Sequence, residues 1–125
     1  MKGSNFWDRI ETVLGGNQMM RALKESLAAV LVDLSNSSIV GVTPLACQLF
    51  GYPEQELIGV HLERLIPEQY RHQHLDFVAE YEQHPRSARM GDRRLPGLRE
   101  DGTVFTSSIW LVPAPDGCVL AVFFE

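Results

Sequence analysis

The chain has 125 residues, 45% hydrophobic and 22% charged, a composition typical of one globular domain with its own core. Its net charge is −5 and its basic residues do not gather into one run, so it lacks the electrostatic footprint of a nucleic-acid-binding protein. No stretch approaches the roughly 18 consecutive apolar residues of a membrane span, and the N-terminus has no apolar signal core, so we expect a cytoplasmic protein without a membrane segment.

Residues 1–27 have the periodicity of helices. Gly15-Gly16 predicts the end of a first helix, because glycine accepts the left-handed cap conformation, and a second helix is expected from Asn17 to Leu27. We therefore expect a helical extension over residues 1–19. The apolar residues that recur at i, i+4, i+7 and i+8 in the first helix are Phe6, Ile10, Val13 and Leu14.

Two short apolar runs follow, at residues 28–34 and 39–42, and a polar turn between them predicts a hairpin. Thr43-Pro44 then combines a hydroxyl N-cap with a proline at the first helical position, which predicts a helix from Pro44 to Phe50 that closes at Gly51. Shorter helices are expected over residues 53–59 and 62–66.

The longest helical segment after residue 27 runs from Glu68 to His84 and ends before Pro85. Its polar side, which includes Gln73, is expected to face water. Its other side is expected to face the core. The residues of that side, at i, i+4, i+7, i+8 and i+11, are Tyr70, His74, Phe77, Val78 and Tyr81.

Three strands are predicted in the last third of the chain, at residues 93–99, 104–112 and 118–124, after a polar connection over residues 86–92. If Ile109 and Leu111 face the core, strand alternation places Trp110 on the outer face of the sheet. An exposed tryptophan there would be costly, so we expect it to be covered. The first helix, of the same or a partner subunit, offers an apolar surface made of Phe6, Trp7 and Ile10.

An ordered set of motifs runs through the middle of the chain. It consists of Ala46, Leu49-Phe50-Gly51-Tyr52, Glu56-Leu57-Ile58-Gly59, Leu65-Ile66-Pro67-Glu68 and Arg99-Glu100-Asp101-Gly102-Thr103-Val104-Phe105. In this order and spacing the motifs resemble the PAS family of sensory domains, over about residues 20 to 124. The resemblance implies an α+β fold of PAS type, in which a five-stranded antiparallel sheet carries helices on one face. The PAS domain would then span residues 20–125, with the extra N-terminal helix before it.

The resemblance also implies a ligand pocket between the sheet and the long helix. His74 looks like the residue that ligates haem iron in the haem-binding PAS domains of bacterial oxygen sensors, and Arg93 matches an arginine near the haem edge. The alternative is that His74 hydrogen-bonds a backbone group between helix and sheet. No other metal site is expected. The residues expected to line the pocket are His74, Phe77, Val78, Arg93, Ile109 and Leu111.

The two cysteines indicate packing rather than chemistry. Light-sensing members of the family carry a reactive cysteine in an Asn-Cys-Arg motif ahead of the long helix, whereas residues 65–70 here contain none, so a photoactive flavin is not expected. Cys47 and Cys118 lie in apolar sequence and match neither a disulfide scaffold nor a zinc spacing. We expect both to be reduced thiols in the core.

The sequence contains no Gly-x-Ser-x-Gly elbow, phosphate loop or HExxH motif, so we expect no enzyme. Two functions remain open. The domain is either a sensor of a small molecule, with haem as the alternative cofactor, or a protein-interaction module whose pocket is collapsed around bulky Phe77 and Phe105. In both cases we expect a homodimer formed through Phe6, Trp7, Ile10 and Trp110, because resembling domains commonly associate through this helix and sheet surface. The sequence names neither the ligand nor the effector.

Overall fold

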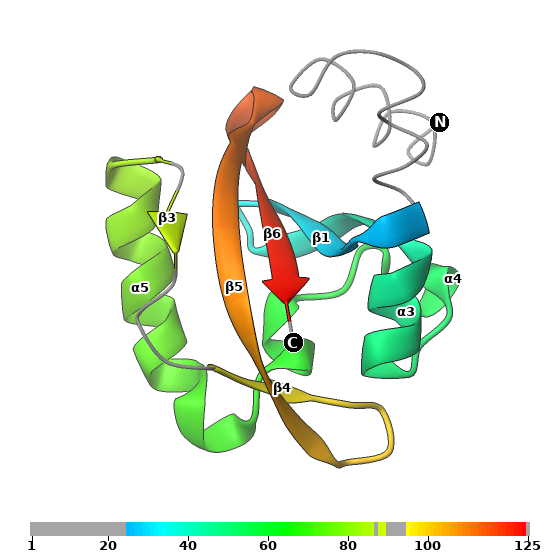
Figure 1. Ribbon diagram of the computed structural model, residues 1–125. Helices are drawn as coiled ribbons and strands as arrows, with labels where there is room; N and C mark the ends of the chain where they lie inside the picture. Colours follow the sequence, from blue (N-terminus) through cyan, green and yellow to red (C-terminus); the bar gives the residue numbers. More distant parts are fainter. Residues whose placement is uncertain (1–24, 87, 90–94, 125) are drawn as a thin grey trace.

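The computed structural model describes residues 25–86, 88–89 and 95–124 (Figure 1). The helices expected before residue 25, with Phe6, Trp7 and Ile10, lie outside the described residues, and so does Arg93. No helix within the described ranges is long and apolar enough to cross a membrane.

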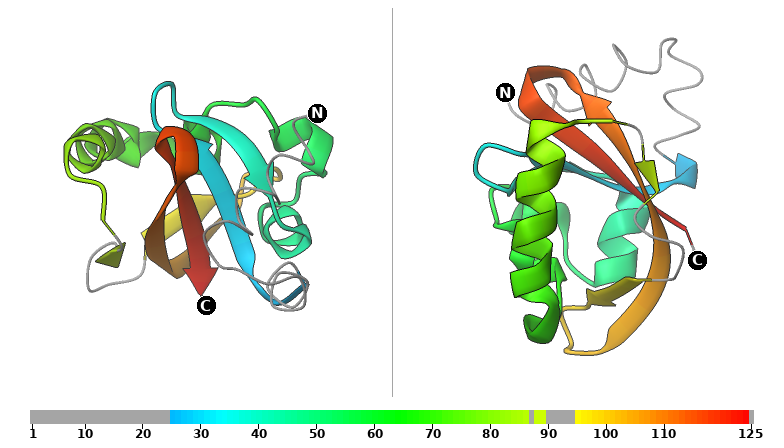
Figure 2. Two further views of the ribbon diagram at one scale, coloured as in Figure 1. Left: turned by 90° about the horizontal axis from the view of Figure 1, so that it is seen from above. Right: turned by 90° about the vertical axis from the view of Figure 1, so that its left-hand side faces the viewer.

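The described residues form one antiparallel sheet with helical segments against one of its faces (Figures 1 and 2). The strand order is β2-β1-β6-β5, and two short strands, β3 and β4, both pair with β5 and share the fifth position. This arrangement confirms the predicted α+β fold with a five-stranded sheet. The strands are β1 (Ala28–Asp33), β2 (Ser38–Val42), β3 (Ala88–Arg89), β4 (Leu95–Leu98), β5 (Val104–Ala114) and β6 (Cys118–Phe124). The helical segments are α3 (Pro44–Phe50), α4 (Glu54–Leu57), α5 (Arg71–Gln83) and three 3₁₀ turns, η1 (Leu62–Leu65), η2 (Glu68–Tyr70) and η3 (Pro115–Gly117).

Two of the predicted elements need correction. Residues 86–92 were expected to be a polar connection, but Ala88–Arg89 forms β3, paired with Trp110 and Leu111. A two-residue strand has no sequence pattern of its own and is formed by the strand beside it. The long helix begins at Arg71 rather than at Glu68, because the residues after Pro67 form a 3₁₀ turn first.

The start of α3 is fixed by Thr43, as the sequence predicts. The buried Thr43 hydroxyl accepts hydrogen bonds from the N–H groups of Ala46, at 3.3 Å, and Ala29, at 2.9 Å. The first bond caps the helix, and the second ties the helix to β1. At the other end, Gly51 adopts φ 83°, a left-handed conformation that glycine accepts without strain.

The β4–β5 hairpin is docked on the end of α3. The Glu100 N–H donates to the Phe50 carbonyl at 2.9 Å, and Arg99 Nε donates to the Leu49 carbonyl at 3.1 Å. Phe50 also packs edge-on against Phe105, with ring centroids 5.2 Å apart. These contacts join the two ends of the sheet's inner face into one core.

Strands β1 and β6 form the centre of the sheet. Ala28 lies opposite Phe123 and Asp33 lies opposite Cys118, so the first residue of β1 is beside the last residues of β6. Buried apolar side chains lie on both faces of this central pair. Val30 and Val32 face the helices, whereas Leu31 packs with Leu120 and Val122 in a separate outer cluster.

Candidate functional site

A cavity of about 330 Å³ lies between α5 and the sheet. This volume is at the lower end of the roughly 300–1,000 Å³ typical of pockets for small molecules. The cavity is lined from α5 and η2 by Tyr70, Gln73, His74, Phe77, Val78 and Tyr81, and from the sheet by Val32, Leu95, Pro96, Gly97, Ser107, Ile109, Leu111, Val119, Ala121 and Phe123. The remaining lining residues are Leu34, Ser37, Phe50, Leu62, Leu65 and Ile66.

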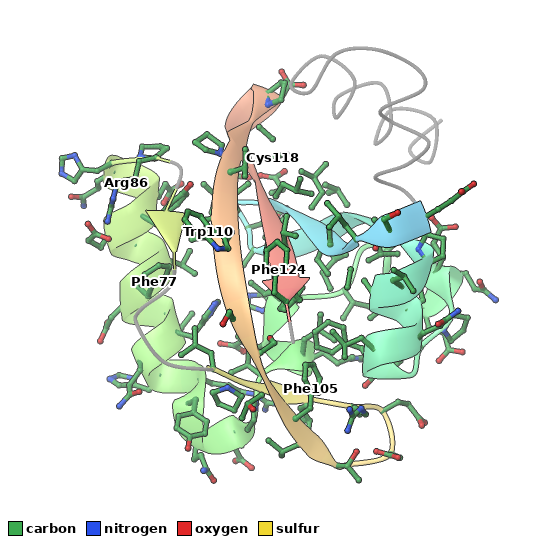
Figure 3. The ribbon with its side chains drawn as sticks, in the orientation of Figure 1. Phe77, Arg86, Phe105, Trp110, Cys118 and Phe124 are labelled. Atoms are coloured by element: carbon green, nitrogen blue, oxygen red, sulfur yellow. The ribbon has the colours of Figure 1, made fainter. Side chains whose placement is uncertain are left out.

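Five of the six residues expected at the pocket line this cavity. His74, Phe77 and Val78 come from α5, and Ile109 and Leu111 come from β5. Figure 3 shows Phe77 on α5 and Trp110 on β5. Phe105 does not line the cavity, although it was expected near it, because its ring packs over Gly97 and against Phe50 instead.

Helix α5 is held at both of its ends. At its start, Arg71 Nε donates to the carbonyls of Glu63, at 3.1 Å, and Ile66, at 3.0 Å. Near its end, the hydroxyl of the buried Tyr81 donates to the Arg86 carbonyl. Between these two points His74, Phe77 and Val78 are only half-buried and face the cavity. The middle of the helix therefore has few packing contacts to resist a shift.

His74 presents a neutral imidazole to the cavity. Burial lowers its pKa from the ordinary value of 6.5, nearby Glu63 opposes this change, and nearby His61 adds to it. Within the described residues the His74 side chain has no hydrogen-bond partner, so the backbone contact considered from the sequence is not formed there.

The described residues do not fit a haem. A histidine that binds a metal almost always donates its second N–H to a partner, and His74 has none in the described part of the chain. A cavity of about 330 Å³ is also much smaller than a porphyrin requires. Among the described side chains, no three His, Cys, Asp or Glu residues are grouped so as to hold a metal ion.

Neither cysteine lines the cavity. Cys118 belongs to the outer cluster, and Cys47 is half-buried on α3. Burial, aided by nearby Glu54, raises the pKa of the Cys47 thiol, so this thiol stays protonated and is a poor nucleophile.

Sequence reasoning missed three polar residues of the cavity, Ser37, Gln73 and Ser107. Ser107 is 1% exposed and lies on the inner face of β5, opposite Leu95. The alternation that places Ile109 and Leu111 inside also places Ser107 inside, so the signal was present. Gln73, expected to face water, lies at the exposed rim of the cavity.

The outer face of the sheet carries two exposed aromatic side chains. Trp110 lies opposite Val122 and is 44% exposed, and Phe124 lies opposite Ser108 and is 42% exposed (Figure 3). Residues opposite one another in an antiparallel pair share a face, so both aromatics project from the side away from α5. The predicted outward direction of Trp110 is confirmed. Its predicted cover lies outside the described residues.

Comparisons with known proteins agree with this architecture. The family model of the PAS fold matches residues 18–123. A domain of a sensory box sensor histidine kinase/response regulator from Geobacter sulfurreducens is similar in structure, with a TM-score of 0.71 and 18% sequence identity over 86% of this chain and 92% of that chain. A PAS domain from Colwellia psychrerythraea has a TM-score of 0.72 and 18% identity over 86% of this chain and 93% of that chain.

A third similar structure is an RNA-binding light-oxygen-voltage receptor, with a TM-score of 0.73 and 18% identity over 91% of this chain but 34% of that chain. At these identities the structural likeness concerns the fold alone. A comparison with curated proteins found no match.

Proposed function

The chain belongs to the PAS family of sensory domains, and we propose that it binds a small, mostly apolar molecule in the cavity under α5 and signals the bound state through protein contacts. The cavity is the observation that carries this proposal. A protein interior is close-packed and rarely leaves voids larger than a water molecule, so a lined space of about 330 Å³ favours a sensor over an interaction module with a collapsed pocket.

The proposed mechanism is a shift between two arrangements of α5 and β5. A ligand that fills the cavity would contact the half-buried middle of α5, which is held mainly at its two ends. It would also contact Ile109 and Leu111, which flank Trp110 in the same strand. A displacement of β5 by the ligand would therefore move Trp110 on the opposite face, and a ligand that favours one arrangement would populate it.

A cavity-filling substitution tests ligand binding. Ala121 faces the cavity, so Ala121→Leu should fill part of it, whereas Ala79→Leu adds the same atoms to the exposed side of α5. Native mass spectrometry of the purified protein should find a bound small molecule, or thermal-shift screening should find an apolar compound that raises Tm. Ala121→Leu should lose that binding while Ala79→Leu keeps it. Equal binding by both variants would contradict the proposal.

We also propose that Trp110 is part of a homodimer interface, together with Phe6, Trp7 and Ile10. The support is its 44% exposure on the outer face, beside the exposed Phe124. Sedimentation velocity should show a dimer, and Trp110→Arg should raise its dissociation constant at least tenfold. Leu75→Arg is the control, because Leu75 is an equally exposed apolar residue on α5, and it should leave the dissociation constant unchanged. A mass that stays monomeric at high protein concentration would remove this part of the proposal.

The domain itself is proposed to be non-catalytic and to bind neither haem nor nucleic acid. Its net charge of −5 supports the absence of nucleic-acid binding, and the lack of a hydrogen bond between His74 and any described residue supports the absence of haem. An absorption spectrum after haem reconstitution checks the second point, since a Soret band that disappears in His74→Ala would restore the haem alternative. The cytoplasmic location expected from the sequence stays a prediction.

A further inference from the structure

The wall of the cavity formed by β5 contains one polar side chain, Ser107, between Phe105 and Ile109 on the inner face. Ser107 is 1% exposed, and no described residue forms a hydrogen bond with its hydroxyl. No fully enclosed side-chain oxygen or nitrogen among the described residues lacks a hydrogen-bond partner, so the Ser107 hydroxyl is open to the hollows that Ser107 lines. A polar group on an otherwise apolar wall is typical of a ligand pocket, where a few placed polar groups give specificity.

The other polar side chains of the cavity differ in exposure. Ser37 and His74 are half-buried, and Tyr70 and Gln73 are exposed. The hydroxyl of the buried Tyr81 already donates to the Arg86 carbonyl. Ser107 lies on the sheet wall opposite α5, and its hydroxyl forms no hydrogen bond with a described residue. It is therefore available to a polar group of a ligand in the cavity.

The rest of the lining limits the charge and size of the ligand. None of the described lining residues is Lys, Arg, Asp or Glu. An ion placed there would lose its hydration without gaining a charged partner. The cavity of about 330 Å³ holds on the order of ten non-hydrogen atoms, taking roughly 30 Å³ for an atom the size of a water molecule.

We propose that Ser107 is the specificity-determining residue of this site, and that the site selects an uncharged, mostly apolar molecule of about ten non-hydrogen atoms with one hydroxyl or carbonyl group that hydrogen-bonds the Ser107 hydroxyl. This inference rests on the proposed ligand-binding function. It adds the chemical class of the ligand and the residue that recognises its polar group.

A second, more open hollow also borders Ser107, on the side of Arg99, Gln48 and Phe124. The guanidinium group of Arg99 would favour an anion in this hollow. The two hollows have separate reporters, since Leu111 lines only the cavity under α5 and Leu45 lines only the hollow beside Arg99.

Three probes of one shape test the inference on the full chain by methyl NMR titration. They are 2-naphthol, which has a hydroxyl, naphthalene, which has none, and 2-naphthoate, which is charged. We expect 2-naphthol to shift the methyl groups of Leu111 and to bind about three- to tenfold tighter than naphthalene, and 2-naphthoate to bind more weakly than either.

Ser107→Ala should abolish the preference for 2-naphthol and leave naphthalene binding unchanged or tighter. It should also leave the Tm of the ligand-free protein nearly unchanged, because it breaks no hydrogen bond with a described residue. Ser37→Ala, at a half-buried serine elsewhere in the lining, is the matched control and should keep the preference.

The outcomes separate the two proposals. If none of the probes shifts Leu111, the ligand-binding function itself fails for this class of molecule. If 2-naphthol and naphthalene bind equally, or if Ser107→Ala keeps the preference, only the role of Ser107 is overturned. Tightest binding by 2-naphthoate would overturn the uncharged ligand class. Shifts at Leu45 would then indicate binding in the hollow beside Arg99, and shifts at Leu111 would indicate binding of the anion in the cavity under α5.

Discussion

Replacing Gly97 by alanine should destabilise the domain through a single contact. An ideal Cβ at Gly97 would lie 2.5 Å from Cζ and 2.8 Å from Cε1 of Phe105, far inside van der Waals contact. The ring cannot easily move away, because Phe50 packs edge-on against it and the Arg99 guanidinium carbon lies 4.8 Å from its centroid. The added methyl group must therefore displace either the ring or strand β4.

Overpacking of this kind costs about 1–3 kcal/mol. Each kcal/mol lowers Tm by about 4 °C in a domain of this size, so Gly97→Ala should lower Tm by about 4–12 °C. Calorimetry of the purified protein measures this directly. Urea unfolding should give the same loss, with an unchanged m-value if the unfolded state is unaffected.

A double-mutant cycle identifies the contact responsible. With Phe105→Ala as background the ring is absent, and Gly97→Ala should then become neutral or stabilise by about 0.4–1 kcal/mol, because alanine restricts the unfolded chain more than glycine does. A loss of equal size in both backgrounds would refute the reasoning, since the cost would then not come from Phe105. A neutral Gly97→Ala in the wild-type background would refute it as well.

Three further changes have defined outcomes. Thr43→Val should lower the free energy of unfolding by about 1–3 kcal/mol in urea titrations, because it leaves the buried Ala29 N–H without its acceptor, whereas Thr43→Ser should retain most of the stability. Burial lowers the pKa of His74, so the unfolded chain binds the proton more readily than the folded one. The free energy of unfolding should therefore fall as the pH drops through 6.5. Between pH 7.5 and 5 it should fall less in His74→Phe than in the wild type, and an identical fall would contradict a buried neutral His74. Arg71→Gln should remove the two hydrogen bonds to the carbonyls of Glu63 and Ile66 and lower the free energy of unfolding by about 1–3 kcal/mol. Amide hydrogen exchange in the first turn of α5 should become faster. Unchanged exchange there would mean that these bonds do not hold the helix.

The sequence predicted best those elements whose first and last residues are determined by neighbouring residues in the chain. Thr43-Pro44 and Gly51 determine both ends of α3 through a cap, a fixed φ and a left-handed turn, and the observed helix has the predicted bounds. The pairing of β1 with β2 likewise follows a turn between two apolar runs. Such signals lie within a few residues of the element that they define, so a sequence contains them in full.

Other features depend on contacts between distant residues. Strand β3 exists because β5 offers it partners, and the 3₁₀ turn before α5 occurs where Arg71 bonds two carbonyls of the preceding segment. The helical phase of residues 70–81 predicted which side chains face the cavity, but not the volume left between them and the sheet. That volume depends on the distance between two elements, which no local pattern records. Ser107 is in between, because its inward direction follows from alternation, whereas the hollows that it lines exist only in the packed structure.

The central position of β1 and β6 has a mechanical consequence. Because Ala28 lies opposite Phe123, a force that pulls residues 28 and 123 apart acts on the last pair of the ladder first and separates the two strands one pair at a time, like a zipper. Shearing would require the whole ladder to break at once, and this geometry avoids it. A tension applied across the two ends of the domain should therefore open it at low force, beginning at the middle of the sheet rather than at its edges.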